Sequence, residues 1–227
     1  QNLDALVGAG AIAADARGLL AEIIRARLAF LVSGGTGAGK TTLLSAAMGT
    51  MSPDERIVCV EDAPELAPRH PHLVRLVARC ANVEGIGEVT VRDLVKQALR
   101  MRPDRIVVGE VRGGEVVDLL AALNTGHDGG ACTVHANNPA EVPARLEALA
   151  ALGGLDRFAL HSQLAAAVQV LLHVSRDRGG RRQLAEIAVL RRSSDGLVTA
   201  LTAWHVERGF TEGMADLSSL LAQRGRA

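Results

Sequence analysis

Aromatic side chains are scarce in this sequence. Of its 227 residues only 2% are aromatic, with no tyrosine and a single tryptophan, Trp204. Proteins that bind single-stranded nucleic acid without sequence preference stack the bases on aromatic side chains, so the composition argues against that mode of binding. The hydrophobic core must instead be built from alanine, leucine and valine.

An excess of either charge is also missing. The chain carries 25 lysines and arginines against 25 aspartates and glutamates, which gives a formal net charge of zero. Affinity for nucleic acid comes largely from cations that neutralise phosphates. We therefore expect no direct nucleic-acid partner, although the balance leaves room for local basic patches.

Cysteines are few and stand far apart. Cys59, Cys80 and Cys132 form no CxxC pair, so the sequence has neither a zinc-site spacing nor a disulfide framework and suits a reducing cytosol. No apolar run reaches the length that crosses a bilayer, and the first residues do not form a signal-peptide pattern. We expect a soluble, cytoplasmic protein that can still dock at the inner face of a membrane.

A glycine-rich segment carries the most specific signal. Residues 28–32 form an apolar run typical of a buried strand, and residues 43–48 are good helix formers. Between them the chain fits the pattern G-x-x-x-x-G-K-[ST] in the strand–loop–helix context that this phosphate-binding loop (P-loop) requires. The residues of the loop are Gly34, Gly35, Thr36, Gly37, Ala38, Gly39, Lys40, Thr41 and Thr42.

The residue types in this loop fit the chemistry of a triphosphate. Glycines adopt backbone angles that let successive N–H groups point at one anion, and the following helix adds the positive end of its dipole. Lys40 would reach the β- and γ-phosphates, and the Thr41 hydroxyl would bind Mg²⁺. The alternative is a glycine-rich turn with an ordinary capping threonine, but the flanking segments fit as well as the motif. We predict that the chain binds ATP and Mg²⁺.

Strands and helices alternate along most of the chain. Strands are predicted at residues 28–32, 56–60, 73–78, 105–109 and 131–135, with helices at 12–27, 91–100, 114–123, from 139 and at 156–168. This alternation predicts an α/β fold with a mostly parallel sheet flanked by helices. Near the C-terminus, apolar and polar residues alternate within three segments that glycine-containing turns separate: residues 170–174, 183–190 and 197–206. This pattern predicts an antiparallel meander at the C-terminal edge of the sheet. We expect one ATPase domain over residues 1–208 and a loosely helical tail over 209–227.

Acidic residues follow the predicted strands. Glu61, Asp62, Glu110 and His135 stand at strand carboxyl ends, the edge where ligands bind in parallel sheets. A carboxylate at Glu110 can orient the attacking water. Glu61, Asp62 and Glu65 could hold Mg²⁺ through water or share the hydrolytic work, or they could only cap a loop.

The histidines and arginines of this region leave more than one interpretation open. His135 could sense the γ-phosphate or pair with Glu110, although a single histidine is more often structural. Arginines that crowd the region are either solvated on helix faces or reach a phosphate across a subunit interface, and the spacing does not choose between these roles. They are Arg75, Arg79, Arg92, Arg100, Arg102 and Arg112.

Three further segments, together with the P-loop, resemble the secretion ATPase superfamily of type II and type IV secretion and type IV pilus motors. Its aspartate box resembles residues 60–66 (VEDAPEL), its Walker B box residues 105–115 (RIVVGEVRGGE), and its histidine box residues 125–137 (TGHDGGACTVHAN). The stretch from residues 82–85 (NVEG) to 102–104 (RPD) is similar to the branch of Flp/Tad pilus assembly ATPases of the CpaF/TadA type. The resemblance covers about residues 3–205.

The resemblance implies a RecA-like ATPase core that works as a homo-oligomer, a hexameric ring with ATP between subunits, and pushes on an inner-membrane platform protein. Matched position by position, Lys40 and Thr41 hold phosphate and Mg²⁺, and Glu110 is the catalytic glutamate. Further residues fall in or beside the family's boxes: Glu61, Asp62, Glu65, Arg79, Arg92, Arg112, His127 and His135.

Two departures and three alternatives accompany this interpretation. Members of the family carry an N-terminal domain before the core, of which only a short helical lead is expected here, so some phosphate-reaching arginines would be missing. Cys80 stands where the family has proline.

The alternatives are a DNA-directed conjugation or helicase-like motor on the same core, a nucleotide-binding scaffold without hydrolysis, and a small kinase.

Overall fold

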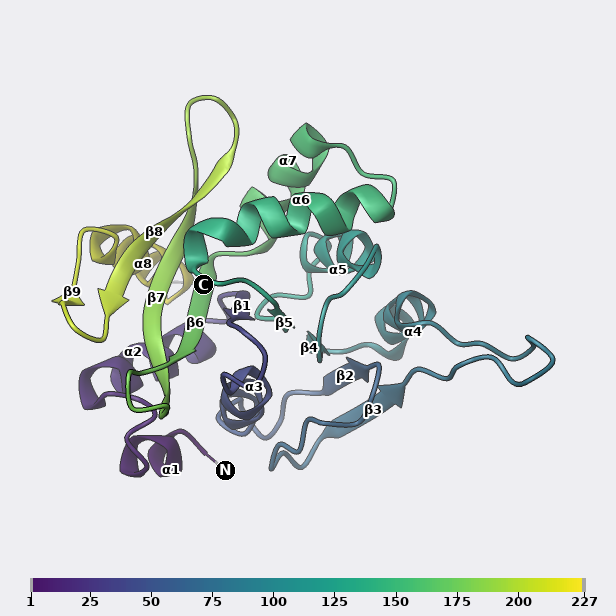
Figure 1. Ribbon diagram of the computed structural model, residues 1–227, viewed down its shortest axis with the longest axis horizontal. Helices are drawn as coiled ribbons and strands as arrows, with labels where there is room; N and C mark the ends of the chain where they lie inside the picture. Colours follow the sequence, from purple (N-terminus) through teal and green to yellow (C-terminus); the bar gives the residue numbers. More distant parts are fainter. Residues whose placement is uncertain (1, 226–227) are drawn as a thin grey trace.

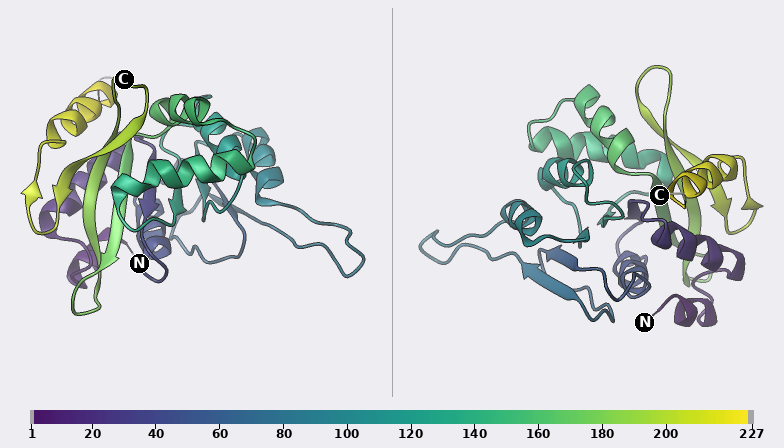
Figure 2. Two further views of the ribbon diagram at one scale, coloured as in Figure 1. Left: turned by 45° about the horizontal axis from the view of Figure 1, so that its top comes forward. Right: turned by 180° about the vertical axis from the view of Figure 1, so that it is seen from behind.

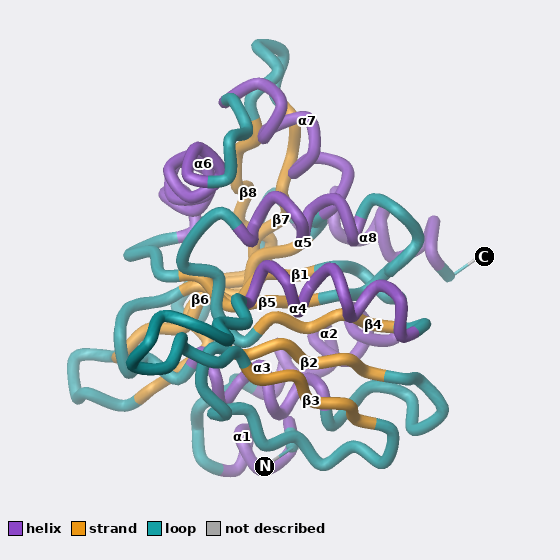
Figure 3. The backbone as a smooth tube through the Cα atoms, turned by 90° about the vertical axis from the view of Figure 1, so that its right-hand side faces the viewer, coloured by secondary structure: helices purple, strands orange, loops and turns teal. Residues whose placement is uncertain are grey.

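One sheet runs through the part of the protein that the computed structural model describes, residues 2–225 (Figure 1). Its strands are β1 (Phe30–Ser33), β2 (Ile57–Glu61), β3 (Leu73–Val77), β4 (Arg105–Val108), β5 (Ala131–Val134), β6 (Val170–Arg176), β7 (Arg182–Arg192), β8 (Val198–His205) and β9 (Gly209–Phe210). Their order across the sheet is β3-β2-β4-β5-β1-β6-β7-β8-β9, and Figure 3 shows the half that runs from β1 to β3.

The sheet changes character at β6. Strand β1 pairs in parallel with both β5 and β6, in a register that sets Ser33 beside Val134 and His173, and β2 pairs in parallel with β3 and β4. From β6 onward the pairs β6–β7, β7–β8 and β8–β9 are antiparallel. The predicted fold, a mostly parallel sheet with an antiparallel meander at its C-terminal edge, is confirmed.

Helices flank the sheet, and most of them lie in the connections between parallel strands. They are α1 (Leu3–Gly8), α2 (Ala14–Arg25), α3 (Lys40–Met48), α4 (Val91–Ala98), α5 (Glu115–Leu123), α6 (Val142–Leu152), α7 (Arg157–Ala167) and α8 (Met214–Arg224), with short 3₁₀ turns at Leu99–Met101 and Pro139–Glu141. The sequence did not predict α1. Among the described residues, no helix combines the length and apolarity needed to span a bilayer.

The helices lie in two layers because successive strand residues point to opposite faces of the sheet. Phe30 and Val32 face the layer of α1, α2, α3 and α8, whereas Leu31 faces the layer of α4 to α7. Figure 2 shows the two layers from further sides. Both cores are almost entirely aliphatic, as the composition predicts, and the single tryptophan, Trp204, is buried in the first.

A buried ion pair joins three elements at the amino ends of β2 and β4. Arg105 begins β4, and its side chain is only 2% exposed. Its Nε donates to Glu55 Oε2 at 2.9 Å, and its Nη2 donates to the carbonyl of Ile24 in α2 at 2.8 Å. Arg27 Nε donates to the other oxygen of Glu55 at 2.6 Å. The pair therefore ties the end of α2 to the starts of β2 and β4.

The segment predicted as a tail packs on the rest of the chain. Strand β9 pairs with β8, and Leu217 of α8 is fully buried. At the end of α8, Arg224 holds Asp128 through two hydrogen bonds of 2.6 and 3.0 Å. The proposed boundary after residue 208 stays a prediction, and residues 1, 226 and 227 of the two predicted segments lie outside the described residues.

A long connection projects from the far edge of the sheet, between β3 and α4 (Figure 2). Arg79 and Val89 form an isolated antiparallel bridge at its base, and Val83 and Ile86 are exposed beyond it. The connection ends at a capping box, in which the Thr90 side chain accepts from the backbone of Asp93 and the Asp93 side chain accepts from that of Thr90, an arrangement that stabilises the start of α4.

Candidate functional site

The loop between β1 and α3 has three positions whose backbone conformation favours glycine. Gly34, Gly37 and Gly39 have φ angles of +154°, +70° and +106°. A Cβ atom on Gly34 would lie 2.4 Å from the carbonyl oxygen of Val174 in β6. Just before the loop, Ser33 Oγ lies 3.0 Å from His173 Nδ1, also in β6. The loop is thus held closely against its neighbouring strand, in a conformation suited to anion binding.

Lys40 points its ammonium group back into this loop. It is the first residue of α3 and is only 7% exposed. Its Nζ donates to the carbonyls of Gly34 and Gly35, both at 3.0 Å, and lies 3.3 Å from His135 Nδ1. Burial lowers the pKa of Lys40, and the nearby Glu110 carboxylate opposes that shift. The loop therefore holds a preorganised cation at the helix start, where anions bind.

A pocket of about 300 Å³ opens over the loop. The structure brings together here ten of the residues that the sequence singled out, from the P-loop, the aspartate box, the Walker B box and the histidine box. The lining residues are Thr36, Gly37, Gly39, Lys40, Thr41, Thr42, Glu65, Glu110, Arg112, His135 and Arg182.

Glu110 follows β4 at the wall of this pocket. Its Oε2 accepts a 2.7 Å hydrogen bond from Arg112 Nη2, and this bond is the main reason why the pKa of Arg112 is raised. Its Oε1 is buried and has no correctly aligned donor, although His135 Nε2 lies 2.5 Å away. A carboxylate that is held between an arginine and a histidine has a fixed orientation and can orient a water molecule.

His135 stands between Glu110 and Lys40. Burial lowers the pKa of its imidazole, the positive charge of Lys40 lowers it further, and Glu110 acts in the opposite direction. The ring is therefore mainly neutral at pH 7. A neutral imidazole carries one N–H, so it can donate to one neighbour and accept from the other.

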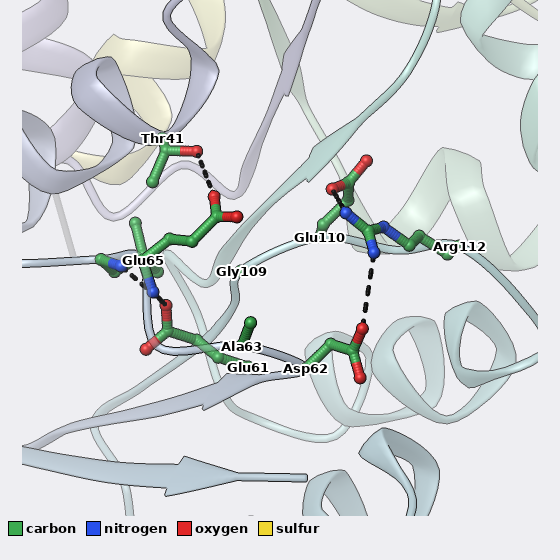
Figure 4. A pocket seen from close by; sticks show the side chains of 9 residues that line it. Thr41, Glu61, Asp62, Ala63, Glu65, Gly109, Glu110 and Arg112 are labelled. Carbon is green, nitrogen blue, oxygen red and sulfur yellow. Dashed lines mark hydrogen bonds and ion pairs between the residues drawn. The ribbon is translucent and has the colours of Figure 1, made fainter. Parts of the chain in front are cut away.

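The loop after β2 contributes the next group of carboxylates (Figure 4). Glu61 is 2% exposed, and its Oε1 accepts from the backbone N–H groups of Glu65 and Leu66 at 2.9 and 2.7 Å. Arg75 Nε lies 3.3 Å from the other oxygen. Glu61 therefore shapes the loop, whereas Glu65 reaches Thr41 Oγ1 at 3.4 Å and Asp62 reaches Arg112 at 3.4 Å.

The donors near Thr41 fit a magnesium ion that is shared with phosphate oxygens. Within residues 2–225, no group of three or more histidine, cysteine, aspartate or glutamate side chains forms a metal site by itself. Mg²⁺ is commonly bound by one or two protein oxygens together with phosphates and waters. The Thr41 hydroxyl and the Glu65 carboxylate supply such oxygens beside Lys40.

Beyond the P-loop, five predicted residues do not line the pocket: Glu61 and Asp62 line an adjoining cavity with Glu65 and Glu110, and His127, Arg79 and Arg92 lie elsewhere. His127 precedes β5, at the opposite end of that strand from His135, and its Nδ1 is 3.1 Å from the carbonyl of Ala122. Arg92 pairs with Asp118 at 2.5 Å, and Arg79 donates to the carbonyl of Gly87 at 2.8 Å. Arg79 and Arg92 line a neighbouring groove of about 480 Å³ that shares Asp62, Glu110 and Arg112 with the site.

Sequence reasoning missed two arginines beside the P-loop. Arg176 ends β6, and its Nη2 donates to the carbonyl of Gly37 at 3.1 Å. Arg182 begins β7 and lines the pocket. The available signal was four arginines within residues 176–182, around a Gly-Gly turn. On sequence alone this stretch predicts only a turn, because its place beside the loop follows from the pairing of β6 with β1.

The chain is similar to several known proteins. The model of the family described as type II/IV secretion system protein matches residues 2–178. A putative conjugal transfer protein of Mycobacterium tuberculosis (strain H37Rv) is 75% identical over all 227 residues. The conjugal transfer protein TrbB of Rhizobium radiobacter is 38% identical over 162 residues, which are 70% of this chain and 47% of that protein.

A solved structure is also similar. The VirB11 ATPase from the type IV secretion system of Brucella suis, in complex with sulphate, superposes with a TM-score of 0.68 at 32% sequence identity, over 82% of this chain and 54% of that one. The chain spans 64% of the length of the Mycobacterium tuberculosis protein.

Proposed function

The chain belongs to the type II/IV secretion system protein family, and from that premise we propose that it is the ATP-hydrolysing core of a secretion motor. The reaction is ATP + H₂O to ADP + phosphate. The observation that carries the proposal is the convergence of Lys40, Thr41 and Glu110 on one pocket over the P-loop. A cation, a metal-binding hydroxyl and a positioned carboxylate are the groups that phosphoryl transfer to water requires.

Each of these groups has a proposed role. Residues 34–42 and the Lys40 ammonium bind the phosphates. Thr41, with Glu65 and with Asp62 through water, holds Mg²⁺, which neutralises phosphate charge when it is bound. Glu110 orients the attacking water, and its neighbours Arg112 and His135 fix its position. Glu61 keeps the loop of Glu65 in place through its backbone contacts.

The remaining candidates have weaker geometric support for a role at the phosphates. His127, Arg79 and Arg92 are bound to neighbouring groups outside the pocket. Arg79 and Arg92 line the groove next to Glu110. We propose that these two act from that groove when a second subunit closes it, as the family's ring arrangement implies.

The proposed work is the assembly of a Flp/Tad-type pilus. In this proposal the chain acts as a homo-oligomer, a hexamer by resemblance, at the cytoplasmic face of the inner membrane, where it pushes on a platform protein. The support for this branch is the resemblance of residues 82–85 and 102–104 to it, whereas the family match supports a type II/IV secretion system protein in general.

A second candidate is a conjugation motor. Its specific support is that the relatives at 75% and 38% identity carry the name of conjugal transfer proteins. The two candidates share the same ATPase chemistry and differ in the substrate that the motor moves. Stimulation of hydrolysis by DNA therefore separates them.

Two variants test the ATPase proposal. Lys40→Ala should weaken ATP binding by about 100-fold, because a charged donor to the phosphates is lost. Glu110→Gln should keep ATP binding and lower the turnover number by about 10²- to 10⁴-fold, because the water loses its base. Fluorescence titration measures the first and phosphate release the second.

The controls are matched in chemistry. Lys96, the other lysine of the chain, lies on α4 outside the pocket, and Glu84 lies on the projecting connection. Lys96→Ala and Glu84→Gln should leave binding and phosphate release unchanged. Hydrolysis by Glu110→Gln at the unmodified rate would refute the assignment of the base. ATP binding by the unmodified chain with no phosphate release would instead favour the non-hydrolysing scaffold.

A further inference from the structure

The phosphate pocket meets a second, mainly apolar cavity. This cavity has a volume of about 160 Å³ and lies between the P-loop, α1, α3 and the hairpin of β6 and β7. Gly39, Thr42 and Arg182 line both cavities. The other lining residues of the apolar cavity are Leu6, Ala11, Ile12, Ala38, Leu43, Val174, Gln183 and Leu184.

Arg182 lies where the two cavities meet, and its guanidinium has no carboxylate partner among the described residues. A Cβ atom built on Gly39 would lie 3.4 Å from Arg182 Cδ, so the stem of the arginine covers the last glycine of the P-loop. Among the described residues, no carboxylate forms an ion pair with the Arg182 guanidinium, whereas the adjacent Arg181 pairs with Asp177 at 2.8 Å. Arg112, the other arginine of the pocket, is bound to Glu110 and Asp62.

The hairpin that carries Arg182 is held against the P-loop. Arg176 donates to the carbonyl of Gly37 at 3.1 Å and to that of Gly180 at 3.3 Å, which joins the loop to the turn of the hairpin. Two residues after Arg182, the backbone N–H of Leu184 donates to the carbonyl of Ala11 at 2.8 Å. The backbone at Arg182 is therefore held beside the P-loop.

We propose that Arg182 is a phosphate ligand supplied in cis, which binds the phosphates nearest the ribose; this inference rests on the proposed ATP-binding function. An arginine without a carboxylate partner at the mouth of an anion pocket is suited to a phosphate, which it binds through paired N–H donors. A nucleotide that spans both cavities passes from its phosphates to its apolar base at this junction. Arg182 consequently contacts the α- and β-phosphates rather than the terminal one.

Nucleotide titrations of the chain test the proposal with ATP and with ADP. Arg182→Ala should weaken the binding of both by about tenfold and by the same factor, because both nucleotides keep the α- and β-phosphates. Arg182→Lys should recover part of the loss. The matched control is Arg178→Ala, which removes the same charge from an exposed position of the same turn that lines neither cavity.

Salt separates a phosphate contact from packing. The affinity difference between the unmodified chain and Arg182→Ala should shrink as ionic strength rises from about 50 to 500 mM, because added ions screen an exposed charge contact. A difference that is independent of salt would indicate packing over Gly39 and overturn the proposal. A loss confined to ATP would place Arg182 at the terminal phosphate and also overturn it.

The remaining outcomes distinguish this inference from the function on which it rests. One outcome would refute only the role of Arg182. In it, the unmodified chain binds ADP, Lys40→Ala does not, and Arg182→Ala has the same nucleotide affinity as Arg178→Ala. If the unmodified chain binds no nucleotide, both proposals fail. Thermal unfolding monitors folding, and Arg182→Gln, which keeps most of the stem over Gly39, replaces Arg182→Ala if that variant unfolds.

Discussion

Neighbouring glycines of the P-loop meet different surroundings. A side chain on Gly34 would run into the backbone of Val174, whereas a Cβ on Gly35 would meet nothing within 4 Å. The backbone of β6 cannot withdraw without disturbing its pairing with β1. In the sequence both positions are simply glycine. The structure shows that only Gly34 has no room for a side chain.

Gly34→Ala should therefore destabilise the protein. We expect the free energy of unfolding to fall by about 1–3 kcal/mol, the usual cost of forcing extra atoms into a packed site. Gly35→Ala is the matched control and should change it by less than about 0.5 kcal/mol. Urea unfolding of the two variants measures the difference, and equal stabilities would contradict the close approach of the loop to β6.

Some residues of the site can be predicted from a short stretch of sequence, and others cannot. Lys40 and Thr41 follow from the motif, because the loop and the start of its helix are one contiguous segment. The strand-end position of Glu110 follows from the apolar run before it. Arg176 and Arg182 could not be found in this way, since their distance from the P-loop depends on strands paired across the sheet.

At the scale of elements, the buried pair of Glu55 and Arg105 joins a helix to two strands. Burial by itself would raise the pKa of Glu55, but the hydrogen bonds and charges of Arg105 and Arg27 outweigh it, and the pKa is lowered. A carboxylate whose pKa is lower in the folded state stabilises the protein above its unfolded pKa of roughly 4.3. This stabilisation is lost as the pH falls through the folded value.

Glu55→Gln should accordingly destabilise the protein at pH 7 by about 2–3 kcal/mol, because it leaves Arg105 buried without a counter-charge. The deficit should shrink as the pH falls through the lowered folded pKa of Glu55, where the unmodified protein becomes protonated at this site as well. Urea unfolding across the pH range measures this. Asp54→Asn, at the exposed neighbouring position, is the control, and a deficit that does not change with pH would refute the charge contribution.

Most elements were predictable because their apolar pattern is regular. For example, the apolar run of residues 105–109 predicts a buried strand. The structure has a buried strand there that ends one residue earlier, at Val108. Helix α1 escaped prediction because its six residues bury only Leu3 and Leu6, which is too short a stretch to show a period. The 3₁₀ turn at Pro139–Glu141 likewise has no apolar repeat that would separate it from α6.

For the molecule as a whole, the charge balance makes a prediction about DNA. With 25 basic and 25 acidic residues, no net field draws the chain to a polyanion. We expect double-stranded DNA at about 50 mM salt to change the rate of ATP hydrolysis by less than about twofold. A phosphate-release assay with and without DNA measures this.

The contrary result would favour the conjugation motor. Strong stimulation by DNA that disappears steeply as salt is added is the behaviour of a protein that neutralises several phosphates. In that case a local cluster of arginines would outweigh the neutral total. The arginine-rich turn of residues 176–182 would then be the first region to substitute.

The class of fold was predictable from the alternation of strands and helices, but the order of the strands was not. The central position of β1, between β5 and β6, depends on packing among segments that are far apart in the chain. Periodicity describes which face of an element is apolar and carries no information about which neighbour it meets. The convergence of the boxes on one pocket was expected only because parallel strands share their carboxyl edge.

The central position of β1 has a consequence for biosynthesis. Ser33 and its hydrogen-bond partner His173 are 140 positions apart, and the chain leaves the ribosome from its N-terminus. The apolar segment ahead of the P-loop is made early, yet its partner strands emerge much later. The nucleotide pocket is therefore completed late in translation, and the nascent chain exposes an aggregation-prone strand until then.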